Sequence, residues 1–169
     1  MRKLDSHQLS YILRHCPESV GVTLDKYGWC NVKELCSATH TSTDELESLV
    51  KSNTRFIYNA DHTYVKAAHG HSVPVIYENA EVPPERLYHG TSRELEATLR
   101  KEGIKPMSRV EVHLSSSPLA AAKIGVRHSD DVWIAEVDAG AMHRDGIVFY
   151  RSEDNVWLVS YVDPKYILN

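Results

Sequence analysis

The sequence lacks a long apolar run. None of its apolar stretches approaches the ~20 residues that a membrane-spanning helix needs. The first segment, MRKLDSHQLSYILRHC, has a basic start but no continuous apolar stretch and no small-residue cleavage site. We therefore expect no signal peptide and a cytoplasmic protein.

Cysteine is scarce: the chain has three cysteines, Cys16, Cys30 and Cys36, without a CxxC spacing. This pattern argues against a disulfide framework and against a zinc site. Free cysteines usually act as small buried hydrophobic residues, and we expect that role for all three, with a catalytic thiol as the alternative.

Excess positive charge is also absent. The formal net charge of the 169-residue chain is −4, which argues against non-specific nucleic-acid binding but leaves room for a local basic pocket. There is no GxGxxG motif and no P-loop. A dinucleotide bound here would therefore not use a Rossmann crevice. The hydrophobic content of 42% allows one domain or two small lobes.

Hydrophobic periodicity predicts three helices in the first part of the chain, at 5–16, 32–39 and 43–52. Asp5 or Ser6 and then Asn31 are suitable N-caps for the first two helices. Residues 55–67 alternate in polarity around a turn and predict a β-hairpin. Three short helices followed by a hairpin are typical of a winged helix. The alternative is a small α+β lobe with no ligand.

A polar, proline-containing stretch at 69–87 indicates a connection between lobes, and we place the boundary so that the lobes are 1–72 and 73–169. The second lobe is rich in predicted strands, with two predicted helices. Its expected strands are 87–90, 111–115, 132–139, 147–152, 156–162 and 166–169, and its expected helices are 92–103 and 117–128. The fold class is α+β, with a compact antiparallel sheet in the second lobe.

The first candidate site residues are Arg14 and His15, at the end of the first predicted helix. They suit either a favourable position in the helix dipole or a clamp for a phosphate oxyanion. Lys66, His69, His71 and Ser72 surround Gly70, where the backbone can approach a ligand closely. They are either a phosphate pocket or an exposed polar linker. No third ligand accompanies the two nearby histidines, so we expect no metal.

There are two further candidate groups: His89-Gly90-Thr91 follows one predicted strand, and His113-Leu114-Ser115 ends another. Loops after strands often bind ligands, and a histidine with a hydroxyl could hold a ribose or a phosphate. Turn formation and helix capping are the alternatives. Arg127 and His128 end a predicted helix, where the helix dipole also favours a cation.

Read in order, these pieces resemble one family, the RNA 2′-phosphotransferases of the KptA type. The resemblance runs from Leu9 to Tyr166 and rests on these motifs: LSYILRH, PESVGVTLD with GW, GHS, LYHGT, MSRVEVHLS, KIGVRH, VDA-x-x-M, GIVFY, VWL and VDPKY. No single motif is decisive, but the ordered set is specific.

The resemblance implies an N-terminal winged-helix RNA lobe and a C-terminal ADP-ribosyltransferase-like NAD lobe, with the active site between them. It also implies a two-step reaction without metal. The RNA 2′-phosphate first attacks C1″ of the NAD nicotinamide ribose and expels nicotinamide. The ribose 2″-hydroxyl then attacks that phosphate, releasing RNA and ADP-ribose 1″,2″-cyclic phosphate. Spliced tRNA is the implied type of substrate, and nothing in the sequence requires more than a monomer.

The family's functional residues transfer to matching positions. The catalytic phosphate-binding set implied by the resemblance is Arg14, His15, Lys66 and Arg127. The implied NAD-binding set is His71, Ser72, His89, Gly90, Thr91, Arg109, His113 and Ser115.

The chain departs from the family pattern at three of these motif positions. Lys66 stands where the family usually has arginine, His69 where it has glutamine, and Asn155 where it has glycine. Lysine keeps the charge but loses the bidentate fork, so the second step could slow or the substrate could differ. Two alternatives follow: an ADP-ribosyltransferase that modifies nucleic-acid phosphates and stops after the first step, and a non-catalytic RNA-binding module.

Overall fold

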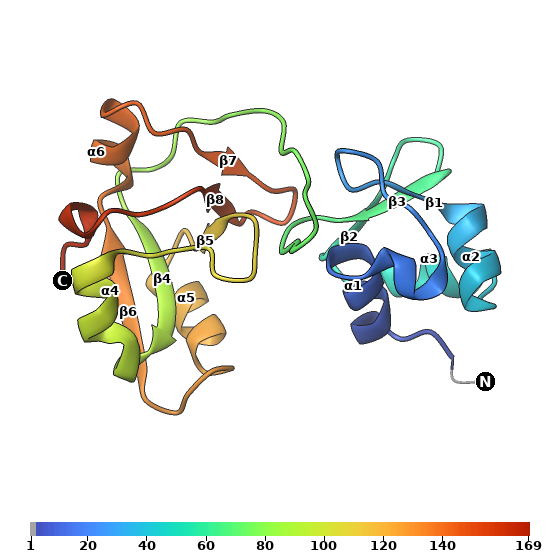
Figure 1. Cartoon of the computed structure of the whole chain (residues 1–169), viewed down its shortest axis with the longest axis horizontal. Coiled ribbons are helices and arrows are strands. Elements are labelled where there is room, and N and C mark those ends of the chain that lie inside the picture. The colour runs from blue at the N-terminus through green and yellow to red at the C-terminus, as the bar shows by residue number, and fades with distance from the viewer. Residues whose placement is uncertain (1–2) are drawn as a thin grey trace. The chain divides into compact units, whose positions relative to one another are not determined.

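The computed structural model describes residues 3–169, which divide into two compact units, Met1–Tyr77 and Glu78–Asn169. We call them the first and the second unit (Figure 1) and describe each by itself. Both combine helices with small antiparallel sheets, which confirms the α+β class. No helix within residues 3–169 is long and apolar enough to span a membrane.

Three helices of the first unit begin where the sequence provides caps: α1 (Ser6–Arg14), α2 (Val32–Thr39) and α3 (Thr43–Lys51). The Asp5 carboxylate accepts from the backbone N–H of Gln8, whose side chain in turn accepts from the Asp5 N–H. Such reciprocal capping satisfies N–H groups that have no partner within the helix. Pro17 starts a 3₁₀ turn, Pro17–Val20, directly after α1.

The sheet of the first unit consists of β1 (Cys30–Asn31), β2 (Phe56–Tyr58) and β3 (Tyr64–Ala67), in the order β1-β3-β2. All neighbours are antiparallel, and β2 and β3 form the predicted hairpin. The buried core joins sheet and helices through Leu9, Leu13, Leu35, Leu46, Phe56 and Val65.

The segment after β3 belongs to the first unit as far as Tyr77, beyond the expected boundary at residue 72. The backbone N–H of Ile76 donates to the carbonyl of Lys26 over 2.8 Å. Val75 is buried and would contact a Cβ at Gly28. These long-range contacts, invisible in the local sequence, attach residues 72–77 to the first unit.

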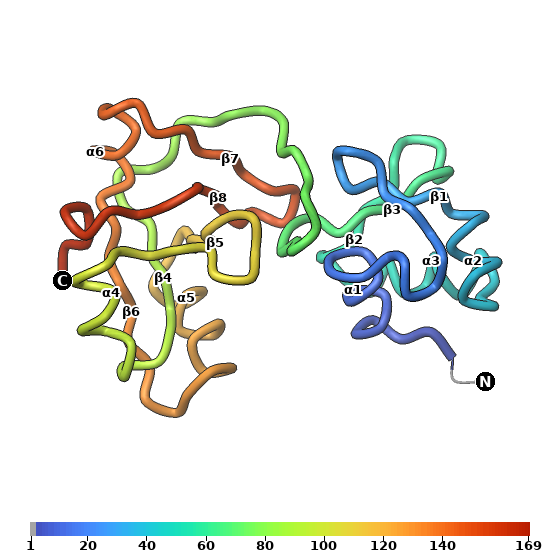
Figure 2. Tube along the Cα trace, viewed as in Figure 1, coloured from blue at the N-terminus to red at the C-terminus, as the bar shows by residue number. Residues whose placement is uncertain are grey.

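The second unit contains two antiparallel sheets, which Figure 2 traces along the chain. In one, β4 (Leu87–Ser92) pairs with β6 (Val132–Val137). The other has the order β5-β8-β7, with β5 (Val112–Leu114), β8 (Trp157–Val159) and β7 (Tyr150–Arg151). The helices and turns of this unit are Arg93–Leu95, α4 (Glu96–Glu102), α5 (Pro118–Gly125), α6 (Ala139–Arg144) and Pro164–Tyr166.

Two strand predictions in the second unit were wrong in part. The strand expected at 132–139 ends at Val137, because the Asp138 side chain caps α6, a helix that was not predicted. Residues 166–169 form no strand: Pro164 starts a 3₁₀ turn, and only Ile167 bridges to Val137. The capping potential of aspartate and the fixed φ of proline were the missed signals.

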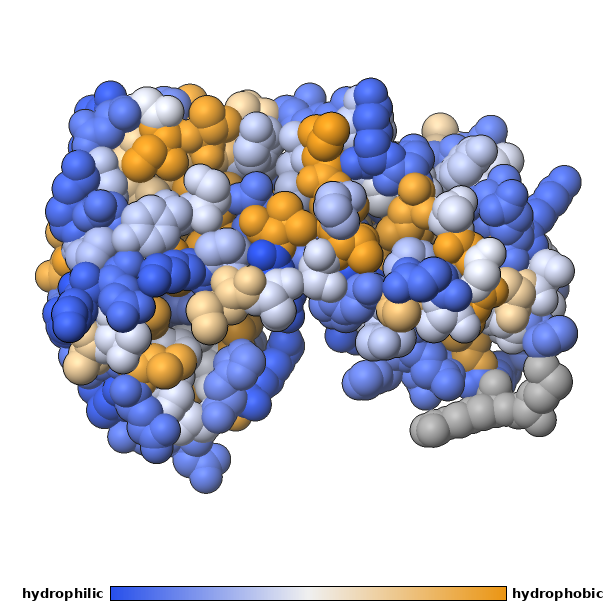
Figure 3. Space-filling model, viewed as in Figure 1, coloured by the Kyte–Doolittle hydropathy of each residue, from blue (hydrophilic) through white to orange (hydrophobic). Residues whose placement is uncertain are grey.

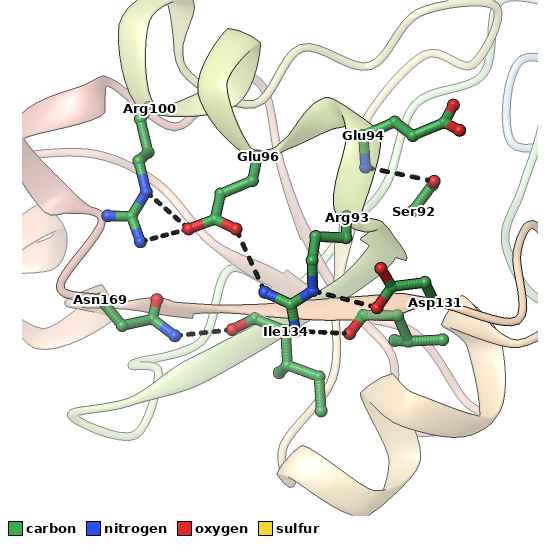
Figure 4. Close-up of polar contacts among 9 residues, drawn as sticks. Ser92, Arg93, Glu94, Glu96, Arg100, Asp131, Ile134 and Asn169 are labelled. Atoms are coloured by element: carbon green, nitrogen blue, oxygen red, sulfur yellow. Dashed lines mark hydrogen bonds and ion pairs between the residues drawn. The ribbon is translucent and has the colours of Figure 1, made fainter.

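Figure 4 shows two groups of polar contacts in the second unit, one at the end of the chain and one around Arg93. The Asn169 amide donates to the carbonyl of Ile134 over 2.8 Å, and Arg93 pairs with Asp131 at 3.0 Å and with Glu96 at 3.2 Å. Arg100 contacts the same Glu96. Because these side chains are largely exposed, each pair adds little stability alone.

Hydrophilic side chains cover much of the face in Figure 3, with apolar patches between them. The buried apolar residues form one core in each unit. All three cysteines are free. Cys30 is buried as expected, and burial raises the pKa of its thiol to about 12. Cys16 and Cys36 are only partly buried, so the expectation of three buried cysteines was wrong for these two.

Candidate active site

The end of α1 and the GHS segment are joined by direct hydrogen bonds. The carbonyl of Arg14 accepts from the backbone N–H of Ser72 over 2.9 Å and from that of Val73 over 3.2 Å. His15 Nδ1 lies 2.8 Å from the Ser72 hydroxyl. Two sequence motifs separated by more than fifty residues therefore meet, and Ser72 orients the His15 ring.

His71 marks the centre of a cationic cluster in the first unit. It is buried, with 2% of its surface exposed, and its Nδ1 lies 2.9 Å from the Tyr77 hydroxyl. Burial, and to a smaller extent the neighbouring Arg14, His69, Lys66 and His15, together lower the pKa of His71 to about 3. The imidazole is therefore neutral at physiological pH, and Arg14 and Lys66 are the permanently charged side chains that act on it.

Gly28 and Trp29 complete this cluster, and the sequence analysis did not select either of them. Gly28 has a φ of +88°, and a Cβ there would lie 3.1 Å from His71 Nε2. Among the described residues, that nitrogen has no hydrogen-bond partner. Lys66, on β3, places its ammonium 4.7 Å from the centroid of the Trp29 ring. The GW dipeptide was the available signal: glycine permits close approach, and tryptophan attracts a cation.

His89 is the central polar group of the second unit's candidate site. Its Nδ1 lies 3.0 Å from the carbonyl oxygen of His113, so Nδ1 must carry the proton and donate. Burial lowers the pKa of His89, as does the charge of His128 more weakly, while the His113 hydrogen bond opposes the shift. The ring is thus neutral, and its Nε2 is an acceptor.

Gly90 lies so close to the backbone of α5 that no side chain fits at this position. A Cβ at Gly90 would lie 1.8 Å from the backbone oxygen of Ala121 on α5. A Cβ at Gly125 would in turn lie 3.3 Å from backbone atoms of Gly90 and Thr91. The end of α5 therefore lies directly on β4, and Arg127 follows that contact by two residues as an exposed side chain.

The remaining predicted residues of the second unit lie around His113. The Arg109 guanidinium is exposed, with Nη1 3.5 Å from His113 Nδ1. Ser115 exchanges backbone hydrogen bonds of 2.9 and 2.7 Å with Tyr88, next to His89. Thr91 and Ser115 are both buried. No group of three or more potential metal-ligating side chains is found within residues 3–169.

The structure thus divides the predicted site residues between the units. The first unit brings together Arg14, His15, Lys66, His71 and Ser72, and the second brings together His89, Gly90, Thr91, Arg109, His113 and Ser115. Arg127 also belongs to the second unit, where it lies exposed after the end of α5. Asn155, one of the departures from the family pattern, has a φ of +62°, the left-handed conformation expected for a residue in the place of glycine.

Comparison with known proteins covers almost the whole chain. The profile of a family described as "RNA 2'-phosphotransferase, Tpt1 / KptA family" matches residues 2–161. A protein of Flavobacterium johnsoniae named "Probable RNA 2'-phosphotransferase" is 46% identical over 94% of this chain and 91% of its own length. Identically named proteins of Fusobacterium nucleatum and Burkholderia pseudomallei are 43% and 42% identical over 94% of this chain, and over 93% and 90% of their own lengths. The chain therefore belongs to the Tpt1/KptA family of RNA 2′-phosphotransferases.

Proposed function

We propose that this protein removes the 2′-phosphate from RNA, of the spliced-tRNA type, by transferring it to NAD as a co-substrate. The observation that carries the proposal is the grouping of two cations, Arg14 and Lys66, and two further histidines, His15 and His69, around the neutral His71. Cations held by buried structure suit a phosphate that changes charge during reaction. Family membership identifies the RNA 2′-phosphate as the chemically matching anion.

The first unit supplies the phosphate-binding residues in this proposal. Arg14 offers a planar fork of N–H donors, and His15, oriented by Ser72, offers a ring nitrogen. Phosphoryl transfer depends mainly on positioning and charge stabilisation, which these residues provide without covalent participation. Arg127 of the second unit is proposed to stabilise the same developing charge.

The second unit fits a ribose. Because the His89 Nδ1–H is committed to the His113 carbonyl, the neutral ring presents Nε2 as an acceptor for a hydroxyl hydrogen. We propose that His89, with Gly90, Thr91, Arg109, His113 and Ser115, binds the NAD ribose and phosphates, assisted by His71 and Ser72. His71 is buried against Tyr77, so its contribution is to position its neighbours.

The proposed reaction has two balanced steps. An oxygen of the RNA 2′-phosphate forms a bond to C1″ of the nicotinamide ribose, and the bond to nicotinamide breaks, with its electron pair leaving on the nicotinamide nitrogen. The ribose 2″-oxygen then bonds to phosphorus, and the bond from phosphorus to the RNA 2′-oxygen breaks. The 2″-hydroxyl proton ends on the RNA 2′-oxygen.

The proposal also covers the roles of the two units, the cellular compartment and the oligomeric state. Three capped helices followed by an antiparallel hairpin support a winged-helix role for the first unit. For the second unit, the paired short sheets support an ADP-ribosyltransferase-like NAD lobe. We propose that the protein acts as a cytoplasmic monomer without a metal.

The test is product analysis with a 2′-phosphorylated oligoribonucleotide and saturating NAD. The expected products are RNA with a 2′-hydroxyl, nicotinamide and ADP-ribose 1″,2″-cyclic phosphate. An RNA left intact by the purified protein would refute the proposal.

A second candidate activity is favoured by the position of Lys66. Its ammonium lies over Trp29 and is a point charge rather than a bidentate fork, so it provides less directed stabilisation for the second step. An ADP-ribosyltransferase that stops after the first step would leave ADP-ribose on the nucleic-acid phosphate. A stable product of that mass, with no cyclic phosphate released, would support this candidate over the first.

A further inference from the structure

A hollow on the exposed side of α1 is lined by His15 and by five residues that have no role in the proposed reaction. Its volume is about 400 Å³, and it is lined by Ser6, His7, Ser10, Tyr11, His15 and Arg55. Small-molecule sites commonly enclose about 300–1,000 Å³, so a nucleotide is within its range.

Aromatic side chains follow one face of α1 in this hollow. His7, Tyr11 and His15 are spaced four residues apart, which places them on one side of the helix. The rings of Tyr11 and His15 are 6.1 Å apart and tilted by 51°. Tyr11 is 49% exposed, although a tyrosine ring buries much apolar surface when covered. An exposed ring of this kind can stack on an unpaired base.

The hollow also carries positive charge and hydroxyl groups. Arg55 Nε donates to the Asn53 side chain over 2.9 Å, which holds the guanidinium. Ser6 and Ser10 add two hydroxyls one helical turn apart. None of the six lining residues is acidic, although the chain as a whole has a net charge of −4. An aromatic ring beside a cation and hydroxyls matches a base, a phosphate and a ribose.

His15 connects this hollow with the phosphate-binding cluster. The same side chain lines the hollow, bonds to Ser72 and contributes to the charge around His71. A ligand in the hollow would therefore adjoin the bound phosphate. We propose that the hollow binds the RNA nucleotide next to the one that carries the 2′-phosphate, with its base on Tyr11 and its backbone phosphate on Arg55.

This inference rests on the proposed function for the identity of the ligand, but its test does not need turnover. The affinity of the whole protein for a fluorescently labelled single-stranded oligoribonucleotide is measured without NAD, across a range of salt concentrations. Tyr11→Ala should weaken binding by about tenfold, and Tyr11→Phe, which keeps the ring, should restore it. Arg55→Ala should reduce the slope of log affinity against log salt by about 0.7, the value for one phosphate contact on a single strand.

Two controls are available in the same unit. Tyr64 is another exposed tyrosine, 40% exposed on β3, and Lys51 is another exposed cation, at the end of α3. Tyr64→Ala and Lys51→Ala should leave the affinity and the salt slope unchanged. Equal losses in the control and test variants would mean non-specific binding and would overturn the inference, as would unchanged affinity in Tyr11→Ala.

The outcome separates the two proposals. Turnover of 2′-phosphorylated RNA with no effect of Tyr11→Ala or Arg55→Ala would keep the reaction and remove the nucleotide subsite. Binding that depends on Tyr11 and Arg55, without any turnover, would keep the subsite and remove the reaction. If the protein has both the reaction and the subsite, lengthening the RNA beyond the phosphorylated nucleotide should lower KM in the wild type more than in Tyr11→Ala.

Discussion

The two units each contain a neutral histidine, but in different surroundings. Around His71 in the first unit, cationic side chains add to the effect of burial. Around His89 in the second unit, a backbone carbonyl and close helix packing dominate, and only His128 adds a charge effect. The first environment suits a highly charged anion, and the second suits a hydroxyl-bearing ligand held close to the backbone. One side-chain type thus serves two binding tasks because its neighbours differ.

Arg127 tests this contrast between the two units, because we propose that this cation of the second unit stabilises the charge that develops on the phosphate. We expect Arg127→Ala to lower kcat by about 10²–10³-fold, since loss of one positioned donor to a developing charge costs about 2.7–4 kcal/mol. Steady-state kinetics with 2′-phosphorylated RNA measures this. Lys123→Ala removes an exposed cation on α5, the helix just before Arg127, and is the control that should retain activity. Near-normal kcat in Arg127→Ala would remove Arg127 from the site.

Gly90→Ala tests the claim that the second site depends on close packing. The new Cβ would lie 1.8 Å from the backbone oxygen of Ala121, so β4 and α5 must separate. We expect the free energy of unfolding to fall by about 3 kcal/mol or more, measured by urea denaturation. In Gly146→Ala, no atom lies within 4 Å of the new Cβ, and only the φ of +91° is strained, at a cost of about 1–2 kcal/mol. Equal losses in the two variants would contradict the packing argument.

The stability of the first unit should depend on the protonation of His71. Its pKa of about 3 lies below the ordinary histidine value near 6.5, so between these pH values the unfolded chain binds more protons. The free energy of unfolding therefore falls as the pH falls through this range, by about 2 kcal/mol from pH 7 to pH 5. Urea denaturation at both pH values measures the difference.

The matched variants for this pH effect are His71→Gln and His143→Gln. His71→Gln should lose most of the pH dependence, whereas His143→Gln should keep it because His143 is exposed on α6. A His71→Gln protein with the full wild-type slope would show that other groups cause it.

Lys66→Arg should change activity least, and it tests whether the first site needs only a positive charge at this position. We expect activity that is unchanged or a few-fold higher, because arginine keeps the charge, can stack on Trp29 and adds the bidentate fork. Single-turnover kinetics that separate the two steps would locate any gain in the second. A large loss would instead mean that the site is built around lysine.

Local signals predicted much of the fold. The starts of α1 and α2 follow from Asp5 and Asn31, because a cap acts on the backbone three residues away. The cap of α3, Ser42, was identified only in the structure. The hairpin follows from alternation in 55–67. The ends of short strands in the second unit were harder to predict. A strand was expected at 147–152, but β7 is only Tyr150–Arg151. Its length depends on pairing with β8, which the local sequence does not reveal.

The candidate site was predicted less evenly. The motifs identified Arg14, His15 and Ser72, but not the direct hydrogen bonds that join them. Gly90 was predicted as part of the NAD-binding set, and its close contact with α5 was not foreseen. Trp29 and Tyr77 were missed, because a partner distant in sequence gives no periodic signal.

The sequence by itself determined the three helices of the first unit, the α+β class and the family, because capping, alternation and ordered motifs are properties of neighbouring residues. Only the tertiary structure decided that His71 is buried among cations, that Gly90 must lack a side chain and that Tyr11 remains exposed beside His15. Desolvation and close packing depend on segments far apart in the chain, so they exist only once the chain has folded.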